Sequence, residues 1–573
     1  MRTGIQSLSQ GIRTTPNWLL LAGALAIVFY LVNALHYGQL PLRIEENEWP
    51  PMGQAIVETG EPVLAADDSH RVRFTEDLQI DTSPFIGAWH PPLYLYTLAA
   101  SMVLLGEEAS FTLRGIGVVG MLATALLLLL IAREVTPRWR SVGGIAAVLL
   151  LIHPYAIQGS LFLDIDNSIY APLILCLLWL AIRFGQREAA LRPAQVLGLG
   201  GLLALVAWAK LTTTIVLTGV LVVWWLLARR PIRRSIVEAS AFIATGAALF
   251  LFTYALWCEI TGVPFSYTFD VTFAAKSDRL FGDFLLTENA AKWHLRWIGA
   301  ALLLLALVYL VDMLRHYLAT RRLRPLDLPF LLGLGILANY VVVSPTDGSY
   351  QGKYAFPALA ALLLPITWML LREQPRPVSA GRWVLAGAVG LVAALLLPDL
   401  ITGVGVNGDY GTWTFALRVV AASSAALLIA WQLGGRRGFA GGVICVLVAL
   451  SVVQAVRSYD AGHSPMYPVA DTQDFRAATN DLNRSTVPGD IVVAPKDLGF
   501  YLHRRVIEGE DAFARGDARL AAAIARYPRI KAVARNSFGP PIGPETTALL
   551  DRCFVDRRTF GTATIAYRSG DCS

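Results

Sequence analysis

Long apolar runs, separated by short polar stretches, fill most of the chain up to about residue 455. Each run approaches the roughly 20 residues that a helix needs to cross a bilayer. The pattern predicts about thirteen crossings, near residues 18–37, 115–132, 141–160, 168–183, 195–209, 212–228, 236–257, 297–314, 328–343, 354–371, 382–397, 413–432 and 439–456. This part of the chain is therefore predicted to be an all-α polytopic membrane protein.

The positions of the basic residues predict the orientation. Besides Arg2 and Arg13, basic tracts lie between apolar runs at 133–140, 183–192, 229–234, 315–324, 372–382 and 436–437. Lys and Arg collect on the cytoplasmic side, so the N-terminus is expected inside, and an odd number of crossings puts the C-terminal segment outside. The first run could be a signal peptide, but no clean small-residue cleavage site follows it, and we interpret it as retained.

Two segments outside these runs have their own patterns. Residues 91–105 are short for a crossing and carry Tyr94 and Tyr96, which favours a helix along the outer interface. After residue 457, short strands are predicted at 491–494 and 532–533, helices at 472–482 and 518–527, and a turn at Pro488 and Gly489. We thus expect a transmembrane domain at 1–457, with a periplasmic loop at 38–114, and a small soluble periplasmic α/β domain at 458–573.

The composition supports a membrane protein. Of the 573 residues, 55% are hydrophobic and only 16% charged, which a water-soluble fold of this size could not sustain. The net charge of +6 resides in tracts that set topology, so a nucleic-acid partner is not expected. The five cysteines lack metal-ligand spacing, and Cys553 and Cys572 are either a disulfide in the outer segment or two free thiols.

The loop between Arg43 and Trp89 is strongly acidic. Its ten acidic residues are Glu45, Glu46, Glu48, Glu58, Glu61, Asp67, Asp68, Glu76, Asp77 and Asp81. Glu45 and Glu46 follow the first crossing closely, and carboxylates near the membrane are costly unless they are solvated or paired. We expect a functional role for these two and simple solvation for the distal acids.

Asp164 and Asp166 form a second acidic pair, between two crossings and flanked by apolar sequence. Buried carboxylates in this setting need a partner, which favours a functional role. The alternative is that Asp166 or Asn167 caps the helix predicted to begin near Ser168.

Lys210 and Lys353, the latter followed by Tyr354, fall at predicted outer ends of crossings and break the positive-inside pattern. They are either snorkelling anchors or a clamp for a phosphate or pyrophosphate, and we favour the clamp. His90 can hydrogen-bond a phosphate or a carboxylate, although a lone histidine can also be structural.

In order, these motifs resemble the GT-C superfamily of polyprenyl-phosphate-sugar-dependent glycosyltransferases, in particular the bacterial branch with protein O-mannosyltransferases and lipid A aminoarabinose transferases. The resemblance rests on an acidic pair after the first crossing, a His-Pro-Pro-Leu-Tyr stretch, an arginine before a crossing and an Ile-Asp pair. More loosely, it includes an Ala-Lys-Leu and a Lys-Tyr stretch. These motifs are Glu45-Glu46, residues 90–94, Arg114, Ile165-Asp166, residues 209–211 and Lys353-Tyr354. Glu45 stands where the family usually has Asp.

The resemblance implies an inverting sugar transfer from a polyprenyl-phosphate carrier to a protein, lipid or glycan acceptor at the outer face of a cell (inner) membrane. Glu45 is expected to be the general base, and Glu46 and Asp166 to orient the acceptor or hold a divalent cation; no cofactor is certain. Lys210, Lys353 and His90 are expected to stabilise the leaving phosphate, with Asp164 and Tyr354 beside them and Arg114 a weaker candidate.

The alternative from another class is a multi-pass transporter or lipid flippase. Such a protein needs ionisable groups near mid-membrane and broken helices in paired halves. The chain shows no sequence repeat, and its candidate polar groups fall at predicted outer ends of crossings. The pattern therefore favours the glycosyltransferase.

Overall fold

The structure is a computed structural model that describes residues 17–40, 42, 46, 49–64, 71–74, 77, 79–81, 85–86, 90–106, 110–187, 189–228, 231–270, 298–343, 355–372, 440–453, 455–456, 472–495, 502, 504–508, 517–536, 542–561 and 563–570. The crossings predicted near 382–397 and 413–432 lie outside these residues. Contacts divide the chain into unit 1 (Met1–Tyr37 and Ile116–Tyr467) and unit 2 (Gly38–Gly115 and Pro468–Ser573).

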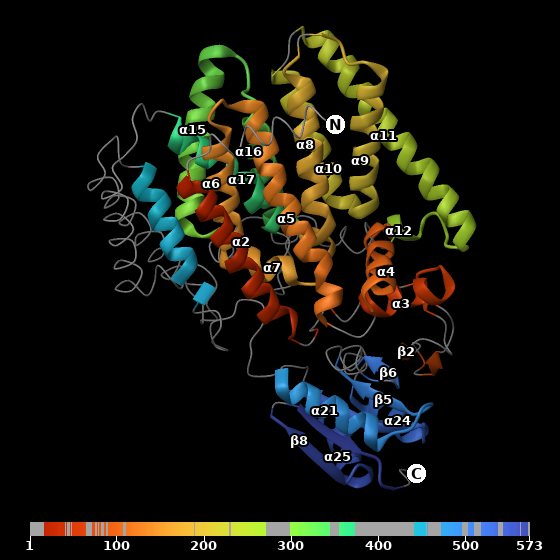
Figure 1. Cartoon of the computed structure of the whole chain (residues 1–573). Coiled ribbons are helices and arrows are strands. Elements are labelled where there is room, and N and C mark those ends of the chain that lie inside the picture. The colour runs from red at the N-terminus through yellow and green to blue at the C-terminus, as the bar shows by residue number, and fades with distance from the viewer. Residues whose placement is uncertain are drawn as a thin grey trace. The chain divides into compact units, whose positions relative to one another are not determined.

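Unit 1 consists of helices that run alongside one another (Figure 1). They are α2 (Asn17–Gly38), α5 (Ser110–Val135), α6 (Trp139–Ile152), α7 (Pro154–Leu161), the π-helix η2 (Asp166–Tyr170), α8 (Ala171–Gly185), α9 (Pro193–Ala209), α10 (Leu211–Ala228), α11 (Ile232–Thr261), α12 (Tyr267–Phe269), α15 (Ala300–Thr320), α16 (Asp327–Val343) and α17 (Phe356–Leu371). A further apolar helix spans Ala440–Val453.

Within the described residues, six helices are long and apolar enough to cross a membrane, or seven if the bent pair α6–α7 is one span. Other apolar helices are shorter, at 10–17 residues. Large apolar side chains such as Leu21 and Leu25 on α2 are about three-fifths exposed, at 60% and 59%, as expected of a lipid-facing surface. The chain is a multi-pass membrane protein, while the total of about thirteen crossings stays a prediction.

The helix predicted at 141–160 is broken. The structure has α6 and α7, bent by 68° at His153, where the sequence predicts one uninterrupted crossing. Pro154 is the first residue of α7, and a proline has no N–H to continue the hydrogen bonding of the preceding helix. The Nδ1 of His153 accepts a hydrogen bond of 3.4 Å from the Ala156 N–H, which caps the new helix.

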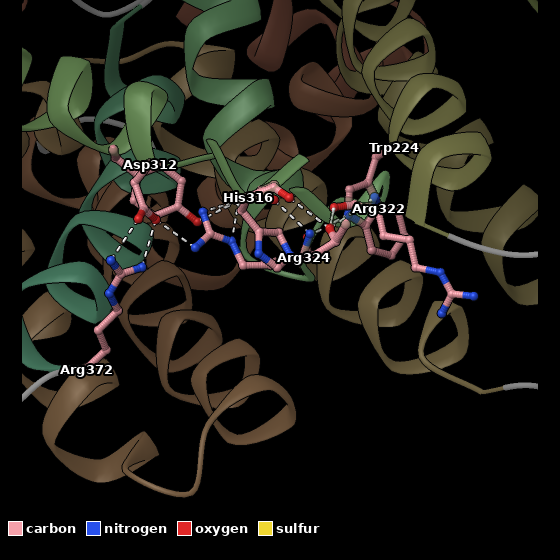
Figure 2. Close-up of polar contacts among 9 residues, drawn as sticks. Trp224, Asp312, His316, Arg322, Arg324 and Arg372 are labelled. Carbon is pink, nitrogen blue, oxygen red and sulfur yellow. Dashed lines mark hydrogen bonds and ion pairs between the residues drawn. The ribbon is translucent and has the colours of Figure 1, made fainter. Parts of the chain in front are cut away.

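Charged side chains link α15, α16 and α17 in one network (Figure 2). Asp312 accepts hydrogen bonds of 2.7 Å from both Arg324 and Arg372, and Arg324 also pairs with Asp327 at 3.2 Å. Both guanidinium groups lie over the Trp368 ring, at 5.1 and 5.3 Å. Planar guanidinium groups suit such forked and stacked contacts. The sequence indicated only a topological role for these two arginines.

Unit 2 combines the loop after α2 with the C-terminal segment. Its helices are α3 (Trp49–Thr59), α4 (Leu93–Leu105), α21 (Thr472–Ser485), α24 (Asp517–Arg526) and α25 (Pro544–Cys553), and its strands are β1 (Val63–Leu64), β2 (Arg71–Phe74), β3 (Ile80–Asp81), β4 (Phe85–Ile86), β5 (Ile491–Ala494), β6 (Arg505–Glu508), β7 (Ile530–Asn536), β8 (Asp556–Phe560) and β9 (Ala563–Tyr567). A seven-stranded sheet has the order β3-β2-β6-β5-β7-β9-β8, and β1 pairs with β4 separately.

The loop contributes a strand to the sheet of the C-terminal segment. β2 pairs in parallel with β6, with Arg71 opposite Val506 and Val72 opposite Ile507. The sequence predicted β5, part of β7 and the helices α21 and α24, but no strand from the loop. The placement of this α/β unit outside the membrane stays a prediction, as does the domain boundary near residue 457.

The C-terminal part of unit 2 has three layers. On one face of the sheet, Ala478 and Leu482 of α21 pack against Val492, Ala532 and Ile565. On the other face, residues of α24 and α25 pack against Val72, Ile491, Val493, Ile507 and Val533. Because β5 is buried on both faces, its four residues are all apolar. Cys553 is buried in the second layer as a free cysteine, which agrees with the free-thiol alternative; Cys572 lies outside the described residues.

Asp517 caps α25 and supports the C-terminal layers. Its carboxylate accepts hydrogen bonds from the N–H groups of Glu545 (2.6 Å) and Thr546 (2.9 Å). Hydrogen bonds from Thr546 and from the Glu545 backbone lower the pKa of Asp517. A depressed pKa means that the carboxylate stabilises the fold above its unfolded pKa of about 4, and that this stability is lost as pH falls through the folded pKa.

We therefore expect Asp517→Ala to lower the thermal unfolding temperature of the C-terminal segment at pH 7, because α25 loses the acceptor for two N–H groups. The difference from wild type should shrink as the pH falls through the folded pKa. Differential scanning fluorimetry of the full chain over a pH series measures it. Asp551→Ala is the control, because Asp551 is 59% exposed and forms a surface ion pair with Arg557. An equal shift in the control would contradict the cap.

Candidate active site

Glu46 and Arg114 of unit 2 form a buried ion pair. Arg114 donates from Nε to one carboxylate oxygen at 3.0 Å and from Nη2 to the other at 2.7 Å, and both side chains are 0% exposed. Its Nη1 donates to the carbonyl oxygens of Leu40 and Gly38. The guanidinium thus joins the start of α5 to the segment that follows α2.

This geometry bears on two of the predicted residues. Both oxygens of Glu46 accept hydrogen bonds from Arg114, so the carboxylate is held by a bidentate, charge-assisted contact. The same contact engages the guanidinium of Arg114, which the sequence suggested as a weaker candidate for stabilising the leaving phosphate. Glu45, the predicted base, lies outside the described residues, and so do Lys353 and Tyr354.

The His-Pro-Pro-Leu-Tyr stretch leads into α4. His90 is partly buried and precedes the two prolines, and α4 begins at Leu93. Tyr94 is buried and its ring makes an edge contact with Trp49 of α3, with centroids 5.3 Å apart. The predicted helix at 91–105 is therefore present and packs against α3, while its place at the membrane interface stays a prediction.

Asp166 and Lys210 of unit 1 form a second buried ion pair. The ammonium of Lys210, which follows the last residue of α9, contacts Asp166 Oδ2 at the start of η2. Their side chains are 1% and 4% exposed. The sequence predicted that a buried carboxylate here needs a partner, and Lys210 is that partner. Asp166 is the first residue of η2, and the capping position before it is Ile165.

Asp164 shapes the turn before this pair. Its Oδ1 accepts a hydrogen bond of 3.3 Å from the Asp166 N–H, and its carbonyl oxygen accepts one of 2.5 Å from the Ser168 hydroxyl. Asp164, Asp166, Asn167 and Ser168 are all buried. The following π-helical turn is a rare conformation that occurs frequently at functional sites. The sequence identified the two aspartates but not the π-turn that presents them.

The described residues contain no group of three or more His, Cys, Asp or Glu side chains that could hold a metal ion. Asp166 and Glu46 each meet a basic side chain instead. A divalent cation held by either residue stays a prediction.

Residues 89–257 match the family model described as dolichyl-phosphate-mannose-protein mannosyltransferase. The structure is similar to ArnT from Cupriavidus metallidurans bound to undecaprenyl phosphate, with a TM-score of 0.59 and 15% identity over 97% of this chain and 99% of that one. No curated protein matches the chain.

A second similar structure is the oligosaccharyltransferase AglB from Archaeoglobus fulgidus in complex with an inhibitory peptide and a dolichol-phosphate. Its TM-score is 0.52 with 12% identity, over 91% of this chain and 69% of that chain. Identities this low show a shared fold.

Proposed function

Because the chain has the GT-C fold that its motifs predicted, and a segment that matches protein mannosyltransferases, we propose that it is a membrane glycosyltransferase. It transfers a hexose or pentose from a polyprenyl-phosphate carrier to a protein, lipid or glycan acceptor, with inversion at the anomeric carbon. The proposed setting is the periplasmic face of a cell inner membrane, with a cytoplasmic N-terminus and a periplasmic C-terminal segment.

The buried Asp166–Lys210 pair is the observation that carries this proposal. Charged groups between apolar helices are costly and are functional by default, and this pair lies in the segment that matches the mannosyltransferase family. The Asp166 carboxylate holds the Lys210 ammonium in place through this ion pair. Lys210 therefore offers a ready cation to a phosphate.

The proposed reaction needs a donor, an acceptor and a general base. The Glu45 carboxylate takes the proton from an acceptor hydroxyl or amine while that atom attacks the anomeric carbon. The bond from that carbon to the phosphate oxygen breaks, and its electron pair leaves on the carrier phosphate. Lys210 stabilises the negative charge that develops there, in a setting shielded from water where such contacts are strong.

The other candidate residues take supporting roles in this proposal. Lys353, Tyr354 and His90 bind the donor phosphate with Lys210, and Asp164 holds the turn that presents Asp166. Glu46, fixed by Arg114, anchors the segment that carries the base.

A transfer assay tests the proposal. Purified full-length protein is given short-chain polyprenyl-phosphate hexoses, pentoses and aminopentoses with membrane extracts as acceptor, and the released polyprenyl phosphate is quantified. Sugar-dependent release with formation of a glycosylated acceptor supports the enzyme. Movement of the intact donor across proteoliposomes without bond cleavage would instead establish a flippase.

Lys210→Gln is expected to weaken polyprenyl phosphate binding about 10- to 100-fold, since a hydrogen bond between charged groups contributes about 1.5–3 kcal/mol. Isothermal titration in detergent measures the affinity. The Asp166→Asn/Lys210→Gln double variant, which leaves no unpaired buried carboxylate, should bind as weakly as Lys210→Gln. Lys531→Gln is the control, because Lys531 is exposed on β7. Unchanged affinity for polyprenyl phosphate in both Lys210 variants would show that Lys210 does not bind the phosphate.

A further inference from the structure

Two glycines on α5 let that helix approach its neighbours by backbone contact. A methyl group at Gly117 would lie 2.9 Å from the carbonyl carbon of Ser160 and closer still to its oxygen. At Gly120, a methyl group would lie 2.8 Å from the carbonyl carbon of Ser168 and again closer to the oxygen. Backbone atoms cannot rotate away as a flexible side chain can, so no side chain fits at either position.

Ser160 and Ser168 are the two ends of the segment that contains the acidic pair. Ser160 lies near the end of α7, where its hydroxyl donates to the Ile157 carbonyl at 2.8 Å and lies 2.9 Å from the hydroxyl of Tyr30 on α2. Ser168 lies within η2 and donates to the Asp164 carbonyl. The two glycine contacts therefore fix this segment on both sides of Asp164 and Asp166.

A short chain of contacts connects Gly120 with the Asp166–Lys210 ion pair. The carbonyl group of Ser168 faces Gly120. The Ser168 hydroxyl donates a hydrogen bond to the Asp164 carbonyl oxygen, and the Asp164 carboxylate accepts one of 3.3 Å from the Asp166 N–H. Asp166 in turn binds the ammonium of Lys210. Two hydrogen bonds and the ion pair thus connect the Ser168 backbone with the Lys210 ammonium.

We propose that Gly117 and Gly120 are positioning residues, which set the place of the Lys210 ammonium through the turn that carries Asp166. This inference rests on the proposed role of Lys210 in binding the carrier phosphate. It assigns to α5 a part in recognising the phosphate of the donor, separate from recognition of its prenyl chain.

The test compares Gly117→Ala and Gly120→Ala with Gly115→Ala, which lies on the same helix and has no atom within 4 Å of the added methyl group. Binding of polyprenyl phosphate and of the uncharged polyprenol is measured for each full-length variant, together with transfer kinetics. Misplacing a reacting group by about 1 Å can cost about 100-fold in rate.

We expect Gly117→Ala and Gly120→Ala to lower turnover about 100-fold and to weaken polyprenyl phosphate binding about tenfold, with polyprenol binding unchanged. Combined with Lys210→Gln, Gly120→Ala should add little further loss of phosphate affinity, because both act on one contact. Gly115→Ala should behave as wild type.

Equal loss of polyprenol and polyprenyl phosphate binding, or losses that add to that of Lys210→Gln, would overturn the positioning role and leave the proposed function intact. Unchanged phosphate affinity in Lys210→Gln would overturn the role of Lys210, and the inference with it. Binding of polyprenyl phosphate, binding of polyprenol and transfer kinetics thus distinguish a failure of the positioning role from a failure of the proposed role of Lys210.

Discussion

Glu45→Gln is expected to reduce sugar transfer about 10²–10⁴-fold, the contribution of a positioned general base, while the protein stays folded and binds polyprenyl phosphate. The amide keeps the size of the side chain but does not take a proton from the acceptor. Turnover of a polyprenyl-phosphate sugar and affinity for polyprenyl phosphate are measured on the same purified sample.

Two further variants sharpen this test. Glu58→Gln removes an exposed carboxylate on α3 of the same acidic loop and should leave turnover unchanged. Glu45→Asp restores the residue that the family usually carries and should keep measurable activity, because it shortens the reach by one methylene but retains the charge. Full turnover in Glu45→Gln would mean that another group takes the proton.

Arg114→Met is expected to destabilise the protein by about 3–5 kcal/mol, the cost of leaving one partner of a buried ion pair alone. Glu46 is 0% exposed, so its carboxylate would lose both guanidinium hydrogen bonds without gaining water. The backbone of Leu40 and Gly38 loses its donor as well. Thermal unfolding in detergent and the yield of folded protein report the change.

The double variant Glu46→Gln/Arg114→Met should recover part of this stability, because the uncompensated charge is gone. Arg183→Met is the matched control: the pair of Arg183 with Glu134 is at 3.9 Å with side chains 43% and 26% exposed, and such pairs contribute about 0–1 kcal/mol. A similar loss in Arg183→Met and Arg114→Met would show that burial of the pair does not decide its contribution.

The helices of unit 1 could be predicted from the sequence because each needs a long apolar run, and such runs are visible without knowledge of their neighbours. The need of Asp166 for a partner followed from the rule that buried charges are paired, whereas its pairing with Lys210 came from the structure. In contrast, the break at His153 required weighing Pro154 against a continuous apolar run, and the run alone predicted one helix.

Features that depend on distant parts of the chain could not be predicted from the sequence. β2 alternates charged and apolar residues from Arg71 to Phe74, but it is only four residues long, and its partner β6 is far along the sequence. Gly117 and Gly120 read as ordinary small residues in an apolar helix. Only the backbone of Ser160 and Ser168, placed against them, shows why a side chain cannot stand there.

The pairing of β2 with β6 has a consequence for biosynthesis. At about 5–20 residues per second, a ribosome needs on the order of tens of seconds to complete the chain between the two strands. Until then Arg71–Phe74 can pair only with β3 (Ile80–Asp81), since β6 and its other neighbour β5 belong to the C-terminal segment. The loop that carries the candidate base therefore completes its fold only when synthesis is nearly finished, so a truncated chain would be left with an unfinished site.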